Sequence, residues 1–335
     1  AMPEHLTWFK WESYATWLSG FTLLMLIYYG GAELYLINTD AMEISIWVAI
    51  CISLVSIFGG WFAYDLLCKS KFGQDNTRLM ILLYIILVAL AWGFTKVFTG
   101  RATFLHLGAI TATIMSANVF ITIIPNQKIV VADLIAGKKP DPKYGKIAKQ
   151  RSTHNNYLTL PVIFLMLSNH YPMAFATEFN WIIASLVFLM GVTIRHYFNS
   201  KHARAGDPKW TWVATTVLFL IIMWLSTVPK VLTGDVEVSL NEREQTLVAS
   251  AQFEDVRDTI LGRCSMCHGA EVYWEGIATA PKGVLLEEDH QIASRAREIY
   301  LQAGRSHAMP PGNITYMEPT ERALIVAWYE GAIAK

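Results

Sequence analysis

Two cysteines and a histidine stand in one short run near the C-terminus, Cys264-Ser265-Met266-Cys267-His268. Thiols three positions apart reach the two vinyl groups of one porphyrin, and the histidine that follows lies under its iron as the proximal ligand. This C-x-x-C-H spacing is the attachment signature of a c-type haem. The alternatives are a disulfide or half of a zinc site, but the sequence has no second cysteine pair to complete a structural zinc site. We therefore predict one covalent haem c.

A second axial ligand is expected in the run after this motif. Met309 stands beside two prolines, in a run that resembles the sixth-ligand loop of class I cytochromes c. Met317 and Met266 are alternative ligands, His307 is a further one, and Met309 as an ordinary core side chain is the remaining interpretation. A methionine–histidine pair raises the reduction potential of a haem. We predict His268 and Met309 as the two ligands of the iron, in a site that accepts electrons readily.

Ionisable residues within or beside apolar segments form a second group of candidates, because charge is costly at membrane depth and marks functional sites there. Asp65 lies deep in such a segment, and the candidate catalytic residues are His106, His154, His170 and Arg151. Neutral imidazoles ligate haem iron and other metals, so one interpretation is a second haem or metal site. The other is that each histidine lies at a membrane interface and bonds to a carbonyl group or a lipid headgroup.

The segment 149–157 is dense in hydrogen-bonding side chains and comes just before an apolar run. One interpretation is the start of a helix, with Ser152 or Thr153 as its N-cap. The other is a segment that holds a planar polar substrate. The residues alone leave both interpretations open.

Apolar segments must position these residues. Hydrophobic residues make up 53% of the chain and charged residues 16%, whereas about a quarter of the residues in a soluble domain are charged. The charge gives no indication of nucleic acid as a partner. We predict an all-α fold, a polytopic transmembrane bundle of about seven helices followed by a small class I cytochrome c-like domain. Seven stretches approach the ~20 residues that cross a bilayer, near Trp17–Ile37, Ile44–Leu66, Leu79–Phe98, Phe104–Ile124, Tyr157–Leu167 with its continuation, Trp181–Phe198 and Trp210–Val228.

The loops between these stretches alternate in charge. Loops 67–78, 125–156 and 199–209 contain several Lys and Arg residues, whereas loops 38–43 and 168–180 contain none. Basic loops stay on the cytoplasmic side of a membrane. We therefore predict that the last span leads out of the cytoplasm and that the C-terminal part of the chain lies outside it.

This topology agrees with the haem motif, since haem c is attached outside the cytoplasm in bacteria. We predict a transmembrane domain at 1–229, a linker at 230–240 and a periplasmic cytochrome c domain at 241–335, in the bacterial inner membrane. The periodicity of apolar residues predicts helices at Asn241–Gly262 and Glu318–Ala332 in the last domain.

Four runs of the sequence resemble the bacterial membrane-bound urate hydroxylase family. These runs are Trp8–Glu12, Ile123–Gln127, Lys149–Pro161 and Ser168–Pro172. In that family a urate oxidase membrane domain is fused to a C-terminal cytochrome c, and the resemblance covers nearly the whole chain. It implies conversion of urate to 5-hydroxyisourate in purine breakdown, with electrons passed to the cytochrome and no hydrogen peroxide formed. Family members usually carry one more transmembrane helix before the part that matches Trp8.

The resemblance also implies partners. Urate is an anion, so we expect a cationic contact, for which Arg101, Arg151 and Arg195 are the candidates. Electrons would leave through a soluble cytochrome or a terminal oxidase. Urate oxidation removes two electrons and one haem accepts one at a time, so either the haem turns over twice or a second redox centre exists. The alternative function is a non-catalytic membrane relay that carries electrons from quinol or a partner protein to the cytochrome.

Overall fold

A computed structural model describes residues 7–38, 41–42, 44–232, 240–277 and 280–333. These residues form helices and no strand, which confirms the all-α prediction. The chain divides into two compact units, Ala1–Leu232 and Thr233–Lys335, named here the membrane unit and the C-terminal unit.

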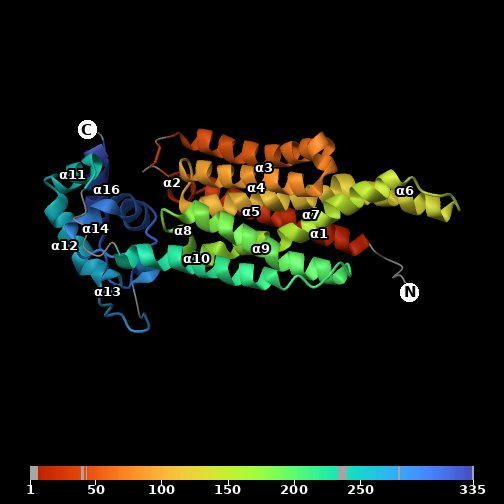
Figure 1. Cartoon of the computed structure of the whole chain (residues 1–335). Coiled ribbons are helices and arrows are strands. Elements are labelled where there is room, and N and C mark those ends of the chain that lie inside the picture. Colours follow the sequence, from red (N-terminus) through yellow and green to blue (C-terminus); the bar gives the residue numbers. More distant parts are fainter. Residues whose placement is uncertain (1–6, 39–40, 43, 233–239, 278–279, 334–335) are drawn as a thin grey trace. The chain divides into compact units, whose positions relative to one another are not determined.

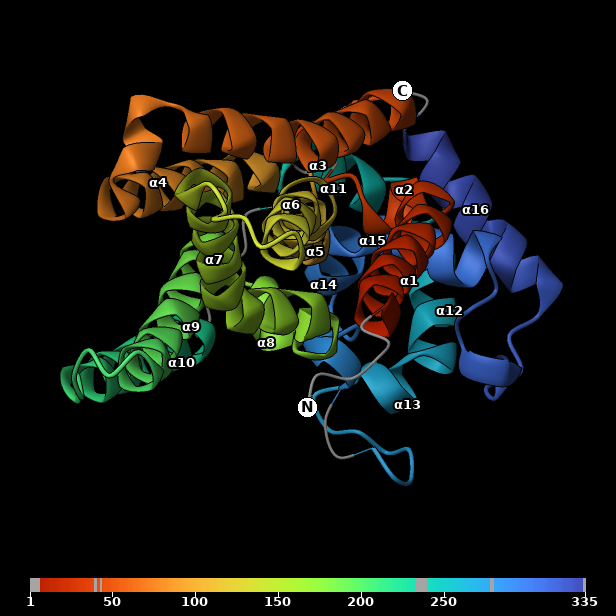
Figure 2. The same cartoon turned by 90° about the vertical axis from the view of Figure 1, so that its right-hand side faces the viewer.

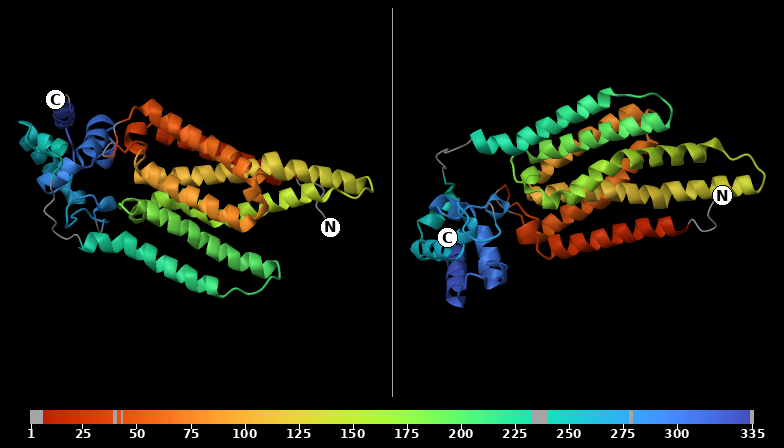
Figure 3. Two further views of the ribbon diagram at one scale, coloured as in Figure 1. Left: turned by 45° about the horizontal axis from the view of Figure 1, so that its top comes forward. Right: turned by 90° about the horizontal axis from the view of Figure 1, so that it is seen from below.

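The membrane unit is a bundle of long helices that run side by side (Figure 1). Its helices are α1 (Thr7–Leu24), α2 (Ala32–Tyr35), α3 (Ile46–Lys69), α4 (Asn76–Thr95), α5 (Gly100–Ala117), α6 (Ile124–Ile135), α7 (Pro142–Leu167), α8 (Pro172–Phe175), α9 (Asn180–His202) and α10 (Trp210–Leu232). Helix α9 packs against α4, α7 and α10, and α5 packs against α3 and α7. The turned views in Figures 2 and 3 keep these neighbours together.

Five helical stretches among the described residues are long and apolar enough to cross a membrane. They are Ile46–Lys69, Asn76–Thr95, Gly100–Ile135, Asn180–His202 and Trp210–Thr227. Large apolar side chains on their outer faces are 61–70% exposed, as at Val55, Phe62 and Val213. A soluble protein would cover such contiguous apolar surface, so these helices are typical of a membrane protein.

Two of the seven predicted spans, Trp17–Ile37 and the one that begins at Tyr157, are not among these five stretches. The first contains α1, a π-helical turn at Met25–Tyr29 and the short α2, with a break at Gly30 and Gly31. The second is the apolar half of α7, whose first half is polar. Both segments are helical, but the structure does not confirm a count of seven spans.

The basic segment 125–156, which the sequence analysis treats as a loop, is a helical hairpin. A π-helical turn at Asn118–Ile123 joins α5 to α6, and α6 packs against the first half of α7. Pro125 is tolerated because it lies in the first turn of α6, where its missing N–H is not needed. The turn back follows at Gly137, whose φ of 67° suits glycine.

Of the two interpretations of the segment 149–157, the one in which Ser152 or Thr153 caps a helix is wrong. Helix α7 begins at Pro142, and the side chain of Asp141 caps it by accepting the backbone N–H of Lys143 at 2.8 Å. Thr153 lies well inside the helix, where its hydroxyl donates to the carbonyl oxygen of Lys149. An aspartate followed by proline is itself a strong helix start. The helix that begins there runs through Ser152 and Thr153, so these residues do not lie at a helix end.

Helices α7 and α9 approach closely where Pro161 faces Gly191. A Cβ atom on Gly191 would lie 2.6 Å from Cδ of Pro161, and the proline ring cannot move aside as a flexible side chain would. We therefore expect Gly191→Ala to reduce the free energy of unfolding by roughly 1–3 kcal/mol. Thermal unfolding of the protein in detergent checks this. Gly93→Ala on α4 is the matched control, because no atom lies within 4 Å of that Cβ position, and an unfolding midpoint lowered equally in both variants would contradict the close approach.

The C-terminal unit is built of α11 (Glu242–Val248), α12 (Phe253–Arg263), α13 (Ser265–His268), α14 (Asp289–Ser294), α15 (Ala296–Ile299) and α16 (Pro319–Ile333). Trp328 is fully buried at the centre of its core and donates its indole N–H to the carbonyl oxygen of Leu247 at 3.1 Å. The predicted helix at Glu318–Ala332 is α16. The predicted helix at Asn241–Gly262 is two helices, because the chain turns between Val248 and Phe253.

Candidate functional site

The C-x-x-C-H motif lies where α12 ends and the one-turn helix α13 begins. Cys264 and Cys267 are free thiols in the structure. The Nδ1 atom of His268 lies 3.0 Å from the carbonyl oxygen of Val284. Because a carbonyl only accepts, Nδ1 carries the hydrogen and Nε2 keeps its lone pair, which is the state in which a histidine ligates a metal. Burial raises the pKa of the Cys264 thiol to about 12, so this thiol is protonated at neutral pH.

The chemistry of this donor set fits a covalent haem. Both thiols are available, and the imidazole is oriented by a backbone carbonyl, as for a ligating histidine. Among the residues that the structure describes, no three His, Cys, Asp or Glu side chains gather as a metal site. A structural zinc site would need such a group, so the described residues do not complete one around the motif.

The three methionines proposed as ligands differ in exposure. Met317 is buried in the core of the C-terminal unit, whereas Met309 and Met266 are 36% and 39% exposed. His307 is exposed as well. A side chain that binds the iron must be accessible to the haem. The exposure of these side chains therefore favours Met309 and Met266 as ligands over Met317, which packs in the core.

Arg322 on α16 holds the loop that carries Met309. Its buried guanidinium donates to the carbonyl oxygens of Ala303 and Met309, the latter at 2.8 Å, and to Oδ1 of Asn313 at 3.0 Å. These charge-assisted bonds tie three points of the loop to one helix. The position of Met309 is therefore fixed by a residue that is distant in the sequence.

Replacing Arg322 with glutamine should loosen this loop. Loss of hydrogen bonds to a buried charged group costs roughly 1.5–3 kcal/mol, so we expect backbone amides of residues 300–317 to exchange with solvent at least about tenfold faster. Hydrogen exchange followed by mass spectrometry on the full chain measures this. Arg305→Gln is the control, because Arg305 is exposed and its carboxylate partner Glu330 lies 3.8 Å away. Equal exchange in both variants would show that Arg322 does not fix the loop.

A cluster of buried polar residues lies inside the membrane unit, between α3 and α7. The Nη2 atom of Arg151 lies 2.7 Å from Oδ1 of Asp65, and the guanidinium lies 4.8 Å from the ring centre of Tyr64. The hydroxyl of Tyr64 lies 2.8 Å from Nδ1 of His154. Arg151 and His154 are one turn apart on the same face of α7, so one helix carries both toward α3.

Two asparagines complete this polar cluster. The side-chain amide of Asn118 donates to the hydroxyl of Tyr64 at 3.1 Å and to Oδ1 of Asn155 at 2.9 Å. Asn118 begins the π-helical turn that follows α5. Such turns are rare and frequently occur at functional sites. The polar cluster thus joins α3, the π-helical turn after α5, and α7. We define it as Tyr64, Asp65, Asn118, Arg151, His154 and Asn155.

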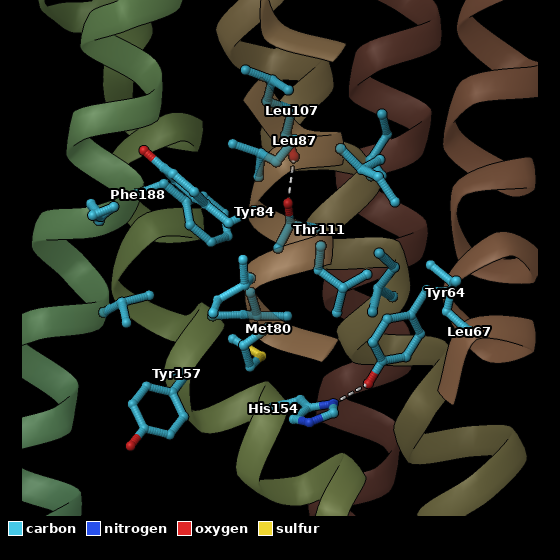
Figure 4. A pocket seen from close by; sticks show the side chains of 18 of the residues that line it. Tyr64, Leu67, Met80, Tyr84, Leu87, Leu107, Thr111, His154, Tyr157 and Phe188 are labelled. Atoms are coloured by element: carbon cyan, nitrogen blue, oxygen red, sulfur yellow. Dashed lines mark hydrogen bonds between the residues drawn. The ribbon is translucent and has the colours of Figure 1, made fainter. Parts of the chain in front are cut away.

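A cavity of about 550 Å³ opens beside the polar cluster, lined from α3, α4, α5, α7 and α9. Figure 4 shows apolar side chains such as Leu87, Leu107 and Phe188 along most of its wall, with Tyr64 and His154 hydrogen-bonded to each other at one end. An apolar cavity with a few convergent polar groups is the usual form of a small-molecule site. The structure therefore contains a second candidate site, separate from the C-x-x-C-H motif.

Two of the four candidate residues of the membrane unit lie together, and the other two lie apart from them and from each other. His154 and Arg151 belong to the polar cluster. His106 is fully buried elsewhere on α5, with Nε2 2.6 Å from Oγ of Ser53 and Nδ1 2.7 Å from the carbonyl oxygen of Ala102. His170 is exposed after α7, and the described contacts do not join it to His106. Both ring nitrogens of His106 are thus engaged in hydrogen bonds.

Tyr64 and Asn118 were not predicted from the sequence. Asn118 interrupts the apolar run of the predicted span Phe104–Ile124, and this position was an available signal. Tyr64 lies two residues before the end of the predicted span Ile44–Leu66, where interfacial tyrosines are common, so its position gave no signal. Asp65 was noted for its depth, but its partner was not assigned. No sequence spacing links α3 to α7, so only the packing of the helices reveals the pairing of Asp65 with Arg151.

These features define a helical membrane protein with a buried polar site in its bundle and a separate thiol–histidine motif. Residues 1–226 match the family model described as "Urate oxidase N-terminal". The match covers more than half of the chain, so the chain belongs to the urate oxidase N-terminal family. This membership indicates a urate-related oxidoreductase function. No curated protein and no solved structure matches the chain.

Proposed function

We propose that this protein is a membrane-bound urate hydroxylase that delivers electrons to its own haem c. In the reaction, urate and water give 5-hydroxyisourate, two protons and two electrons, so the added oxygen comes from water. The main observation in support is that one chain contains both parts. Residues 1–226 match the urate oxidase N-terminal family model, and a C-x-x-C-H motif follows at Cys264–His268. The electrons would pass on to a soluble cytochrome or a terminal oxidase of the respiratory chain.

Residues of the C-terminal unit would hold the haem. Cys264 and Cys267 would attach the porphyrin, Nε2 of His268 would bind the iron, and Met309 is the proposed second ligand. A haem with this ligand pair supplies a one-electron acceptor of raised potential. Val284 orients the imidazole through its carbonyl oxygen, and Arg322 holds the loop of Met309. Each urate delivers two electrons, so the haem must be reoxidised between them unless a second redox centre holds one.

We further propose seven spans, with α1 and α7 added to the five apolar stretches. The basic residues of the α6–α7 hairpin then lie in the cytoplasm, and the domain at 241–335 lies in the periplasm. A reporter that is active only in the cytoplasm, fused after Lys335, should be silent. Activity of that reporter would refute the topology.

The proposed function is tested by urate consumption without oxygen. Purified haem-loaded protein in detergent should consume urate anaerobically when ferricyanide is supplied, with two ferricyanide ions reduced for each urate. No hydrogen peroxide should form when air is admitted. Urate consumption that requires oxygen and yields peroxide would contradict an electron route through the cytochrome.

The apolar wall of the cavity supports the alternative function. Most of its wall is apolar, which suits a lipophilic quinol, so a non-catalytic relay from quinol to the cytochrome is the second candidate. In that case quinol would reduce the haem and urate would not. Reduction by urate alone, without a partner protein or quinol, favours the hydroxylase.

A further inference from the structure

We propose that urate binds at the polar end of the membrane-unit cavity, where Arg151, His154 and Asn118 contact it. This inference rests on the proposed function and assigns its substrate site. Tyr64 and His154 line this end of the cavity of about 550 Å³, and Arg151 and Asn118 lie just behind its lining, each in contact with Tyr64, so urate would reach them past these two side chains.

The proposal is based on buried hydrogen-bonding atoms that have no partner. Buried polar atoms normally have partners, and an exception calls for an explanation such as a missing ligand. Arg151, His154 and Asn118 are at most 3% exposed. Yet Nε and Nη1 of Arg151, Nε2 of His154 and Oδ1 of Asn118 all lack a hydrogen-bond partner in the structure. Four unused atoms on three residues that all contact Tyr64 indicate a common ligand.

The hydrogen-bond directions show which kind of ligand fits. Asn118 donates to the hydroxyl of Tyr64, so that hydroxyl directs its own hydrogen to Nδ1 of His154. A neutral imidazole that accepts at Nδ1 carries its hydrogen on Nε2. The unused atoms of Arg151 and His154 are therefore donors, and Oδ1 of Asn118 is an acceptor. Urate presents carbonyl oxygens and ring N–H groups on one planar rim, which match this set.

The charge of the site favours an anion. Asp65 pairs with Arg151 through one oxygen at 2.7 Å and with Lys69 through the other at 2.6 Å. The side chain of Lys69 is 71% exposed, so its ammonium is solvated, but it shares the carboxylate with Arg151 and weakens the neutralisation of the buried guanidinium. Only Nη2 of Arg151 bonds to Asp65, so Nε and Nη1 remain for a ligand. A urate anion at these two atoms would be attracted by the guanidinium that Asp65 neutralises only in part.

Two substitutions test whether urate binds at this site. Arg151→Lys keeps the charge and the pairing with Asp65 but removes the spare donors, and His154→Phe keeps a planar ring without a hydrogen-bonding atom. Each should weaken urate binding about tenfold or more, equivalent to about 1.4 kcal/mol. The matched controls are Arg204→Lys and His202→Phe, which change exposed residues after and at the end of α9. Thermal unfolding in detergent confirms that each variant is folded.

Binding is measured by equilibrium dialysis of radiolabelled urate against the full chain with its haem reduced beforehand, so that no turnover occurs. Weaker binding in Arg151→Lys and His154→Phe, with both controls like the wild type, supports the site. Equal binding in the wild type and in folded Arg151→Lys and His154→Phe would overturn the site and leave the proposed function standing. A wild-type protein that binds no urate and whose oxidised haem urate does not reduce would overturn both.

Discussion

Replacing both motif thiols, as Cys264→Ala with Cys267→Ala, should leave a protein that carries no covalently bound haem. Thioether bonds need these two sulfur atoms, and the other two cysteines, Cys51 and Cys68, lie in the membrane unit on α3. The loss should be complete, because no other thiol stands beside a histidine in the sequence. Haem staining after denaturing electrophoresis measures it directly, with extraction of the polypeptide by acidified acetone as a second test.

Cys51→Ala is the matched control for this double variant. Cys51 is exposed on α3, so its removal should leave the haem content unchanged. The double variant should also lose reduction by urate, whereas Cys51→Ala should keep it. Covalent haem that survives in the double variant would place the attachment site elsewhere and contradict the role of the motif.

Replacing Met309 with alanine should lower the reduction potential of the haem. A thioether sulfur stabilises the reduced iron, so its loss favours the oxidised state. We expect a fall on the order of 100 mV or more, within the ~0.8 V over which axial ligands set haem potentials. A spectroscopic redox titration of the full-length protein gives the midpoint. The variant should then also donate electrons more readily and accept them from urate less readily.

Met317→Leu is the control for the ligand assignment. Met317 is a core residue, and a leucine of similar volume fits a core with little loss of stability. Its haem potential should match that of the wild type. A potential that is unchanged in Met309→Ala would show that another side chain, such as Met266 or His307, binds the iron.

Local signals allowed much of this account to be predicted from the sequence. The C-x-x-C-H motif is contiguous, so its residues are adjacent whatever the fold. The apolar spans are similarly local, because each helix satisfies its own backbone in lipid. The all-α class followed from these two signals. Candidate residues Arg151 and His154 were found because ionisable groups near an apolar segment are costly.

What the sequence could not predict depends on contacts between distant segments. The pairing of Asp65 with Arg151 and of Tyr64 with His154 exists only because α3 and α7 pack together. The role of Arg322 on the Met309 loop is of the same kind. The start of α7 was misplaced because two capping signals, at Asp141 and at Ser152, compete in one polar segment, and propensity alone does not decide between them.

The packed structure also changes how the polar segment 149–157 is interpreted. Since α7 begins at Pro142, this segment is the middle of a continuous helix, and its polar residues do not serve a helix end. Arg151, His154 and Asn155 share one face, and each has a contact in the polar cluster. This leaves the binding of a planar polar substrate as the interpretation that the packing favours.

An anaerobic titration of the oxidised haem with urate tests the central claim most directly. The account predicts that the purified protein, without quinol or any partner, shows the absorbance bands of reduced haem c as urate is added. Each urate releases two electrons and each chain holds one haem, so a reduced haem must pass its electron to the oxidised haem of another chain before the second electron is accepted. With this exchange, reduction should be complete at half a molar equivalent of urate. Haem that stays oxidised in excess urate, while ascorbate reduces it, would contradict the proposal that the membrane unit oxidises urate and reduces its own cytochrome.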